Sequence, residues 1–219
     1  DVWKTYATKQ GVYFQTFSKL FFLDLATDTI KAWKSKTTFH RSFYVNGKLY
    51  VMQPQIGLMT LYGGSLHLVP DGEKFSHELI YTILTYSATK IVIGTRAKGL
   101  FLFDGASAAP FRTDADSLLI KNQIYNGTML PDGNFALATV RGGVIIIDKY
   151  GRLQKILDES SGLQDNTVLF AFSDAQYGMW LALNNGITRV EIASPLTIFT
   201  EQAGIKSYVQ SMIRHNGRL

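Results

Sequence analysis

The feature that most constrains the fold is an internal repeat with a period of about 43 residues. Three segments share one pattern: a short apolar strand, a turn that ends in glycine, a second apolar strand and then an acid. They cover 90–104, 134–148 and 178–191, and a weaker copy covers 48–62. The turn glycines are Gly57, Gly99, Gly143 and Gly186, separated by 42, 44 and 43 residues. An earlier version without the glycine covers 12–16 and 19–24.

The segments between these strand pairs are also regular. A strand-like run precedes a pair at 80–86, 123–130 and 167–172, and a fourth strand follows at 109–113, 153–157 and 196–200. Asn46-Gly47, Asp132-Gly133 and Asn216-Gly217 are the dipeptides that favour tight hairpin turns. No apolar periodicity of a full helix is present.

Four short strands per unit predict an all-β fold, a β-propeller of about five four-stranded blades. We place the blades approximately at 1–36, 37–78, 79–120, 121–163 and 164–204, with the start of a further blade at 205–219. An unpaired first strand would leave an exposed sheet edge. Either the chain is a fragment of a larger propeller, which we favour, or 209–215 pairs with 12–16 and 19–24 and closes a five-bladed ring. The second arrangement requires that 2–6 does not already form a first strand.

Several prominent residues have structural explanations in this fold. Asp24, Asp104, Asp148 and Glu191 recur where the third strand ends, and we expect them to bond turn N–H groups rather than a calcium ion. Trp180 falls in a second strand, and we expect it in the core between neighbouring blades.

Composition excludes several classes of function. The 219 residues are 46% hydrophobic, which supports a real core, and no apolar run reaches the roughly 18 residues of a membrane helix. Cysteine is absent, so disulfides and thiolate metal sites are excluded. The net charge of +5 is spread along the chain, which does not favour nucleic acid as a partner. The four histidines form no ligand motif, suit exposed or turn positions, and lead us to expect no metal and no cofactor.

The turns between second and third strands are the candidate ligand site. In a four-stranded blade they open on the same face as the links between blades. They carry cationic and amide donors that suit an anionic or sugar-like ligand, at Gln55, Arg96, Lys98, Arg141, Asn184 and Asn185. Ordinary polar loops are the alternative explanation. The first strands at 80–84, 124–129 and 168–172 contain almost no acid or base, so catalytic residues are not expected in the central channel.

One blade carries a more specific pattern. The residues 162–168, followed by 173–190 with Asp174, Gly178, Trp180 and Asn185-Gly186, resemble the two-component regulator propeller repeat. The match is weaker in the blades around Gly94 and Gly142, where we take Ile91 and Phe135 to replace the tryptophan, and it is poor before residue 60.

This resemblance implies a non-catalytic, periplasmic ligand-sensing domain of a membrane-anchored signal-transduction protein, with a histidine kinase or cyclase output elsewhere. The implied partners are an unknown small molecule or glycan and the rest of the parent signalling protein; a homodimer stays open, and the membrane is reached only through a segment outside this chain. The alternatives are a propeller hydrolase or lyase acting on carbohydrate or a lactone, and a protein-interaction scaffold.

Overall fold

The computed structural model describes residues 1–192, which form five antiparallel sheets in chain order. The first sheet contains β1 (Lys4–Ala7), β2 (Gly11–Gln15), β3 (Lys19–Asp24) and β4 (Thr29–Lys34). The second contains β5 (Ser42–Val45), β6 (Lys48–Gln53), β7 (Gly57–Tyr62) and β8 (Ser65–Leu68). The third contains β9 (Ile80–Thr85), β10 (Ile91–Thr95), β11 (Leu100–Phe103) and β12 (Ala108–Pro110).

The fourth sheet contains β13 (Ile124–Met129), β14 (Phe135–Thr139), β15 (Val144–Ile147) and β16 (Leu153–Leu157). The fifth contains β17 (Val168–Ser173), β18 (Gly178–Leu183) and β19 (Gly186–Glu191). In each sheet, consecutive strands are neighbours. The fourth strand expected at 196–200, the turn at Asn216-Gly217 and the further blade expected at 205–219 lie outside the described residues.

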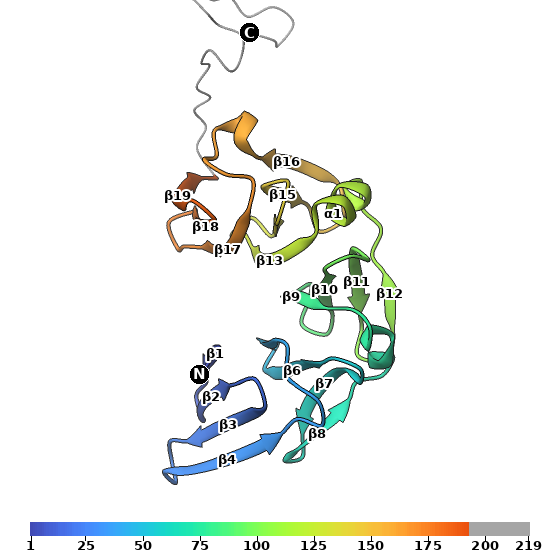
Figure 1. Ribbon diagram of the computed structural model, residues 1–219, viewed down its shortest axis with the longest axis vertical. Coiled ribbons are helices and arrows are strands. Elements are labelled where there is room, and N and C mark those ends of the chain that lie inside the picture. The colour runs from blue at the N-terminus through green and yellow to red at the C-terminus, as the bar shows by residue number, and fades with distance from the viewer. Residues whose placement is uncertain (193–219) are drawn as a thin grey trace, which may run out of the picture.

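The sheets are the blades of a β-propeller. Figure 1 shows them in an arc around a common centre, with β1, β9, β13 and β17 on the inner side and β4, β8, β12 and β16 on the outer side. The inner strands of adjacent blades are in contact, since β13 packs against both β9 and β17. This arrangement brings the first strand of every described blade to one axis.

The core lies between consecutive blades rather than inside any one of them. Four clusters of buried residues each join one blade to the next. Strand β14 shows the reason, because alternate side chains point to opposite faces of a sheet. Phe135 and Leu137 pack against the third blade, whereas Ala136 and Ala138 pack against the fifth. A blade with a neighbour on each side therefore has two apolar faces.

The turn chemistry predicted from the repeat is confirmed. The four repeat glycines all have positive φ: Gly57 at 128°, Gly99 at 72°, Gly143 at 69° and Gly186 at 97°. A Cβ at Gly143 would lie 1.9 Å from the Leu157 carbonyl oxygen, so this position excludes any side chain. The glycine thus fixes both the turn and its close approach to the outer strand.

The recurrent acids form turns as predicted in three blades. In Asp24, Asp104 and Asp148, the Oδ1 atom accepts hydrogen bonds from backbone N–H groups of the turn that follows. Glu191 ends β19 and pairs with the guanidinium of Arg189 on the same strand. The turn that follows it lies outside the described residues, so its role in that turn stays a prediction.

The structure also contains one helix that the sequence did not predict. Helix α1 (Asp116–Asn122) links the third and fourth blades, and its buried residue is Leu119. The Thr113 N–H and hydroxyl both donate to Asp116 Oδ1 at the start of the helix. Two turns of helix are too short to establish an apolar period in the sequence. Two short 3-10 helices, Gly72–Phe75 and Glu159–Ser161, occupy other links.

The condition for the five-bladed ring is not met at the N-terminal end. Strand β1 pairs with β2 in antiparallel register, from Lys4 opposite Gln15 to Ala7 opposite Val12. The first blade therefore has a first strand of its own, and it occupies the place beside β2 that 209–215 would take in the five-bladed ring. Residues 209–215 themselves lie outside the described part of the chain.

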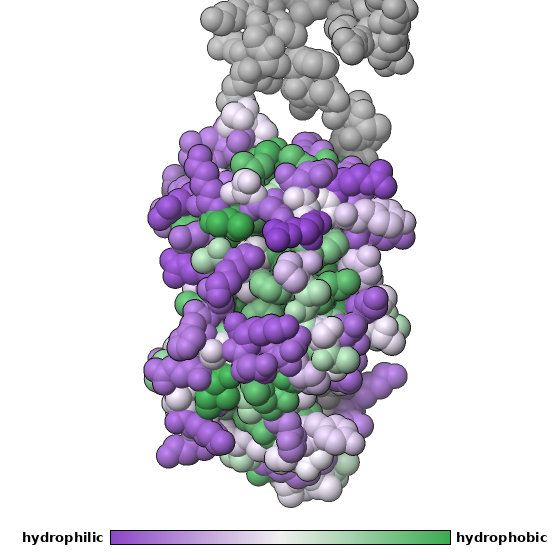
Figure 2. Space-filling view, turned by 90° about the vertical axis from the view of Figure 1, so that its right-hand side faces the viewer, coloured by the Kyte–Doolittle hydropathy of each residue, from purple (hydrophilic) through white to green (hydrophobic). Residues whose placement is uncertain are grey.

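The outer surface gives little indication of a site. On the side where β12 lies, hydrophilic and hydrophobic residues are interspersed (Figure 2). Within residues 1–192, no helix is long and apolar enough to cross a membrane.

Candidate functional site

The predicted ligand-binding turns lie where the blade geometry requires. Each is hydrogen-bonded to a link between blades: Gln55 N to the Ser76 oxygen (2.8 Å), Arg96 N to the Leu79 oxygen (2.9 Å) and Asn184 N to the Thr167 oxygen (3.0 Å). The turns and the links therefore share one face of the propeller.

The side chains predicted to bind ligand on this face are all exposed. Arg96 Nε donates to Gln123 Oε1 at 3.1 Å, and Lys98 Nζ pairs with Glu78 Oε1 at 3.1 Å. Arg141 has no ion pair with any described residue, and Asn184 and Asn185 extend from the turn that precedes Gly186. Gln55 is held at a positive φ of 71°. A role for these six residues in binding stays a prediction.

A second group of polar residues gathers at the axis, and sequence reasoning missed it. A pocket of about 310 Å³ lies there, and every described blade or the link before it contributes to its lining. Its polar members are Lys4 of β1 and His40 and Arg41, which directly precede β5. Aromatic rings complete the wall, from Trp3, Tyr81, Tyr125 and Phe170.

The expectation of almost no acid or base concerned the first strands at 80–84, 124–129 and 168–172, and these contain no Asp, Glu, His, Lys or Arg. It rested on the blades from residue 79 onward, where the repeat is clear. Lys4 and Arg41 belong to the first two blades, whose sequences match the repeat more weakly than the others. A charged residue immediately before a short strand at 42–45 was the available signal.

Arg41 is the centre of the pocket. Its guanidinium carbon lies 4.4 Å from the ring centroid of Tyr81 and 4.6 Å from that of Tyr125. Its Nη1 atom donates to the carbonyl oxygens of the same two residues, at 3.3 Å and 2.8 Å. Burial lowers the pKa of Arg41, and the nearby tyrosines oppose that effect. Among the described ion pairs, none provides a carboxylate for Arg41.

Lys4 places a second cation beside Arg41. Its ammonium nitrogen lies 5.3 Å from the ring centroid of Phe170, so the first and fifth blades approach each other at the axis. Burial lowers the pKa of Lys4, and the charge of Arg41 lowers it further. The pocket thus concentrates positive charge next to flat aromatic surfaces.

His40 lies on the same wall and differs from the other histidines. Its ring meets Tyr81 edge-on, with the centroids 5.0 Å apart. Burial, then the charge of Arg41, lowers the pKa of His40 to about 4; a backbone hydrogen bond at Ile80 opposes this, and Arg96 adds to it. The prediction of an exposed or turn position is wrong for His40. His67 and His77 are exposed, and His215 lies outside the described residues.

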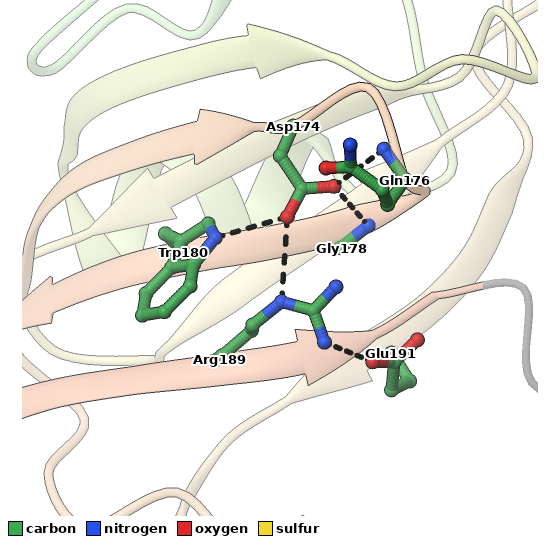
Figure 3. A network of polar contacts seen from close by, with 6 residues as sticks. All are labelled: Asp174, Gln176, Gly178, Trp180, Arg189 and Glu191. Atoms are coloured by element: carbon green, nitrogen blue, oxygen red, sulfur yellow. Dashed lines mark hydrogen bonds and ion pairs between the residues drawn. The ribbon is translucent and has the colours of Figure 1, made fainter.

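The residues of the two-component repeat motif form a hydrogen-bonded network in the fifth blade (Figure 3). Asp174 Oδ1 accepts from the backbone N–H groups of Gln176 (2.9 Å) and Gly178 (2.7 Å). Its Oδ2 accepts from Trp180 Nε1 (3.0 Å) and from Arg189 Nε (3.3 Å). The Gly178 N–H, followed by the other donors, lowers the pKa of Asp174. The motif therefore fixes a hairpin and orients an indole ring.

Trp180 faces away from the fourth blade, and the further blade expected to cover it lies outside the described residues, so its place in the core stays a prediction. Its side chain is 43% exposed, on the blade face that also carries Phe172 and Ile187. The neighbouring residue Met179 faces the fourth blade instead. Because alternate residues face opposite sides, a shift of one position decides between the two outcomes.

The strand register also corrects the comparison between blades. Met179 lies opposite Val190, the residue before the blade's final acid, and Ile91 and Phe135 hold the equivalent places opposite Phe103 and Ile147. These two residues therefore match the buried Met179, not Trp180. Their place in the core follows from that match.

Within residues 1–192, no group of three or more His, Cys, Asp or Glu side chains is arranged to hold a metal ion. The chemistry of the axial pocket comes from cations, aromatic rings and one histidine. Cations and aromatic rings are groups that can bind anions and the faces of rings.

Comparison with known proteins supports the fold. No family model matches the sequence, and no curated protein is significantly similar to it. The extracellular domain of a protein described as a hybrid two-component system from B. thetaiotaomicron superposes with a TM-score of 0.67 at 17% identity, over 86% of this chain and 27% of that one. A second such domain from the same organism gives 0.63 at 22% identity, over 86% and 26%.

A catalytically inactive virginiamycin B lyase from Staphylococcus aureus gives a TM-score of 0.63 at 12% identity, over 88% of this chain and 70% of the lyase. The chain spans about a quarter of the length of the two extracellular domains. These similarities define the chain as a β-propeller. The extracellular domains among them are consistent with the resemblance to the two-component regulator propeller repeat.

Proposed function

We propose that this chain is part of the extracytoplasmic, ligand-sensing propeller of a membrane-anchored bacterial signal-transduction protein of the two-component type. It performs no catalysis of its own. It binds a small molecule or glycan, and binding changes the balance between two arrangements of the propeller and the rest of the parent protein. The periplasm is the compartment that fits such a sensor.

The observation that carries this proposal is the axial pocket. Lys4 and Arg41 provide positive charge, and the rings of Trp3, Tyr81 and Phe170 provide flat apolar surface. Binding sites for small molecules combine apolar walls with a few convergent polar groups in this way. No Asp or Glu lines the pocket within the described residues, so the acid–base pair of a glycoside hydrolase is not assembled there. The shared fold with two extracellular domains of two-component systems supports the same assignment.

An enzymatic function is the second candidate, because this chain superposes on 70% of the length of the lyase from Staphylococcus aureus. In the axial pocket, His40 is the side chain able to act as a base at neutral pH, since its pKa of about 4 keeps the ring neutral. A lyase of carbohydrate or lactone would depend on this residue. A sensor would not.

The test uses the natural gene in its own cells. A reporter of the parent protein's output is measured while acidic and neutral saccharides are supplied one at a time, and protease added outside the cytoplasmic membrane reports where the propeller lies. The proposal predicts that the propeller is digested from outside and that at least one saccharide activates the reporter. Protection of the propeller from external protease would contradict the extracytoplasmic assignment.

Chemical conversion of the saccharide separates the two candidates, because His40 also lines the pocket and its replacement affects binding as well as any catalysis. If the propeller only senses, the purified protein leaves the activating saccharide chemically unchanged. If it is an enzyme, a product accumulates with the wild type and not with His40→Gln. The matched control is replacement of the exposed His67 with glutamine.

A further inference from the structure

The axial pocket contains a charge arrangement that is incomplete without an anion. Lys4 and Arg41 both line it, and the charge of Arg41 lowers the pKa of Lys4. Two cations held together and partly withdrawn from water cost free energy unless an opposite charge compensates them. In the described chain, neither cation has a carboxylate partner.

The hydrogen bonds of Arg41 show which of its donors are available. Both described bonds start from Nη1 and end at main-chain oxygens, which fixes the guanidinium plane between Tyr81 and Tyr125. The Nε and Nη2 atoms have no acceptor among the described residues. These two nitrogens form the side of the guanidinium that binds the two oxygens of one carboxylate or sulfate. The fold therefore positions a donor fork that no described residue occupies.

The surfaces around this fork suit a ring-shaped ligand. Trp3 is 52% exposed and Phe170 is 44% exposed, and both line the pocket together with Lys4. The volume of about 310 Å³ lies at the small end of the range of ligand pockets, about 300–1,000 Å³. It fits one or two sugar rings better than a larger ligand.

We propose that the axial pocket binds an acidic sugar, with the carboxylate or sulfate group on Arg41 and Lys4 and a face of the sugar ring against Trp3 or Phe170. This assignment rests on the proposed sensing function and names the ligand class of its site. Carboxylate and sulfate share the chemistry that the donor fork recognises, and the experiment below separates them.

The test is calorimetric titration of the protein that contains this chain, purified at its natural length. The probes are D-glucuronate, D-glucose 6-sulfate and the neutral D-glucose. We expect at least one acidic sugar to bind about tenfold or more tightly than glucose, since a charge-assisted contact is lost with the neutral sugar. Equal binding of glucose, or no binding of either acidic sugar, would overturn the proposal.

Two variants assign the binding to these residues. Lys4→Gln removes one charge without touching the Arg41 stack, and Arg41→Lys keeps the charge but removes the planar fork. Each is expected to weaken binding of the acidic sugar by about tenfold. Lys155→Gln, on the outer strand β16, is the matched control and leaves binding unchanged. If Arg41→Lys disturbs folding, Lys4→Gln alone decides, and unchanged affinity in that variant overturns the assignment.

The outcome stays separate from the fate of the sensing function. If both variants retain the cellular response to the activating saccharide, the axial assignment is wrong and the sensing function stands. If the acidic sugar binds through Lys4 and Arg41 but no saccharide activates the reporter, the pocket stands and the sensing function is wrong.

Discussion

Protonation of His40 gives the most specific physical prediction. In the folded chain its pKa is lowered from 6.5 to about 4, first by burial and then by the charge of Arg41. The fold therefore favours the neutral ring, and the unfolded chain takes up the proton first as the pH falls. The stability that depends on neutral His40 is complete above the unfolded pKa of 6.5 and is lost progressively as the pH falls toward about 4.

The size of this effect follows from the same shift. The interval from 6.5 to about 4 corresponds to about 3 kcal/mol if it is taken at face value. The ring is only partly buried, so solvent screening reduces the expected loss to about 1–2 kcal/mol. His40→Gln removes the titrating group, and its free energy of unfolding should fall less than that of the wild type across this pH interval.

The assay is denaturant unfolding of the wild type and the variant at closely spaced pH values across the same interval. Carboxylates with lowered pKa values, such as Asp104 and Asp158, destabilise both proteins equally in acid and cancel in the difference. The exposed His67, replaced with glutamine, is the control. A difference in the free energy of unfolding between wild type and His40→Gln that does not change with pH would refute the reasoning. Burial of a neutral ring with a lowered pKa makes that difference depend on pH.

Three further predictions test the turn chemistry and the turn face. Asp174→Ala removes the acceptor of four hydrogen bonds in the β17–β18 hairpin, and hydrogen exchange of that hairpin should become faster while the other blades keep their protection. Gly143→Ala should destabilise the protein by more than about 1 kcal/mol in denaturant unfolding, because φ is 69° and the new Cβ would meet a backbone oxygen at 1.9 Å. Gly133→Ala, with φ at 85° and open space around the Cβ, should cost less; equal losses would contradict the steric argument. Replacing Arg96 and Arg141 with alanine should abolish binding of an acidic saccharide if the turn face contributes to the site. Unchanged calorimetric affinity would show that the turn face does not bind the saccharide.

The repeat predicted most of the architecture because its turns are determined locally. Gly99 and Gly143 need positive φ wherever a second strand turns into a third, and that requirement is visible in any one blade. The turn acids Asp104 and Asp148 are local in the same sense, since they bond N–H groups two to four residues away. Helix α1 was missed because seven residues cannot display a helical period.

The candidate site was predictable only in part because it is assembled from distant segments. Arg41 meets Tyr125, 84 residues later in the chain, and Lys4 meets Phe170 on the other side of the axis. Neither Lys4 nor Arg41 has a cationic counterpart in the first strands of the later blades, so the repeat gave no reason to expect charge at the axis. The face of Trp180 could not be assigned from the sequence for a different reason: the period of two in a strand assigns a face only when the register is known.

The proposed function requires that this propeller recognises a ligand and does not transform it. This is tested by incubating the purified natural-length protein with the acidic sugar it binds, recording the saturable heat, and then following the mass and amount of the sugar over time. A sensing propeller binds the sugar saturably and leaves it chemically unchanged. A product that accumulates with time in the wild type, and not in His40→Gln, would contradict the proposed function.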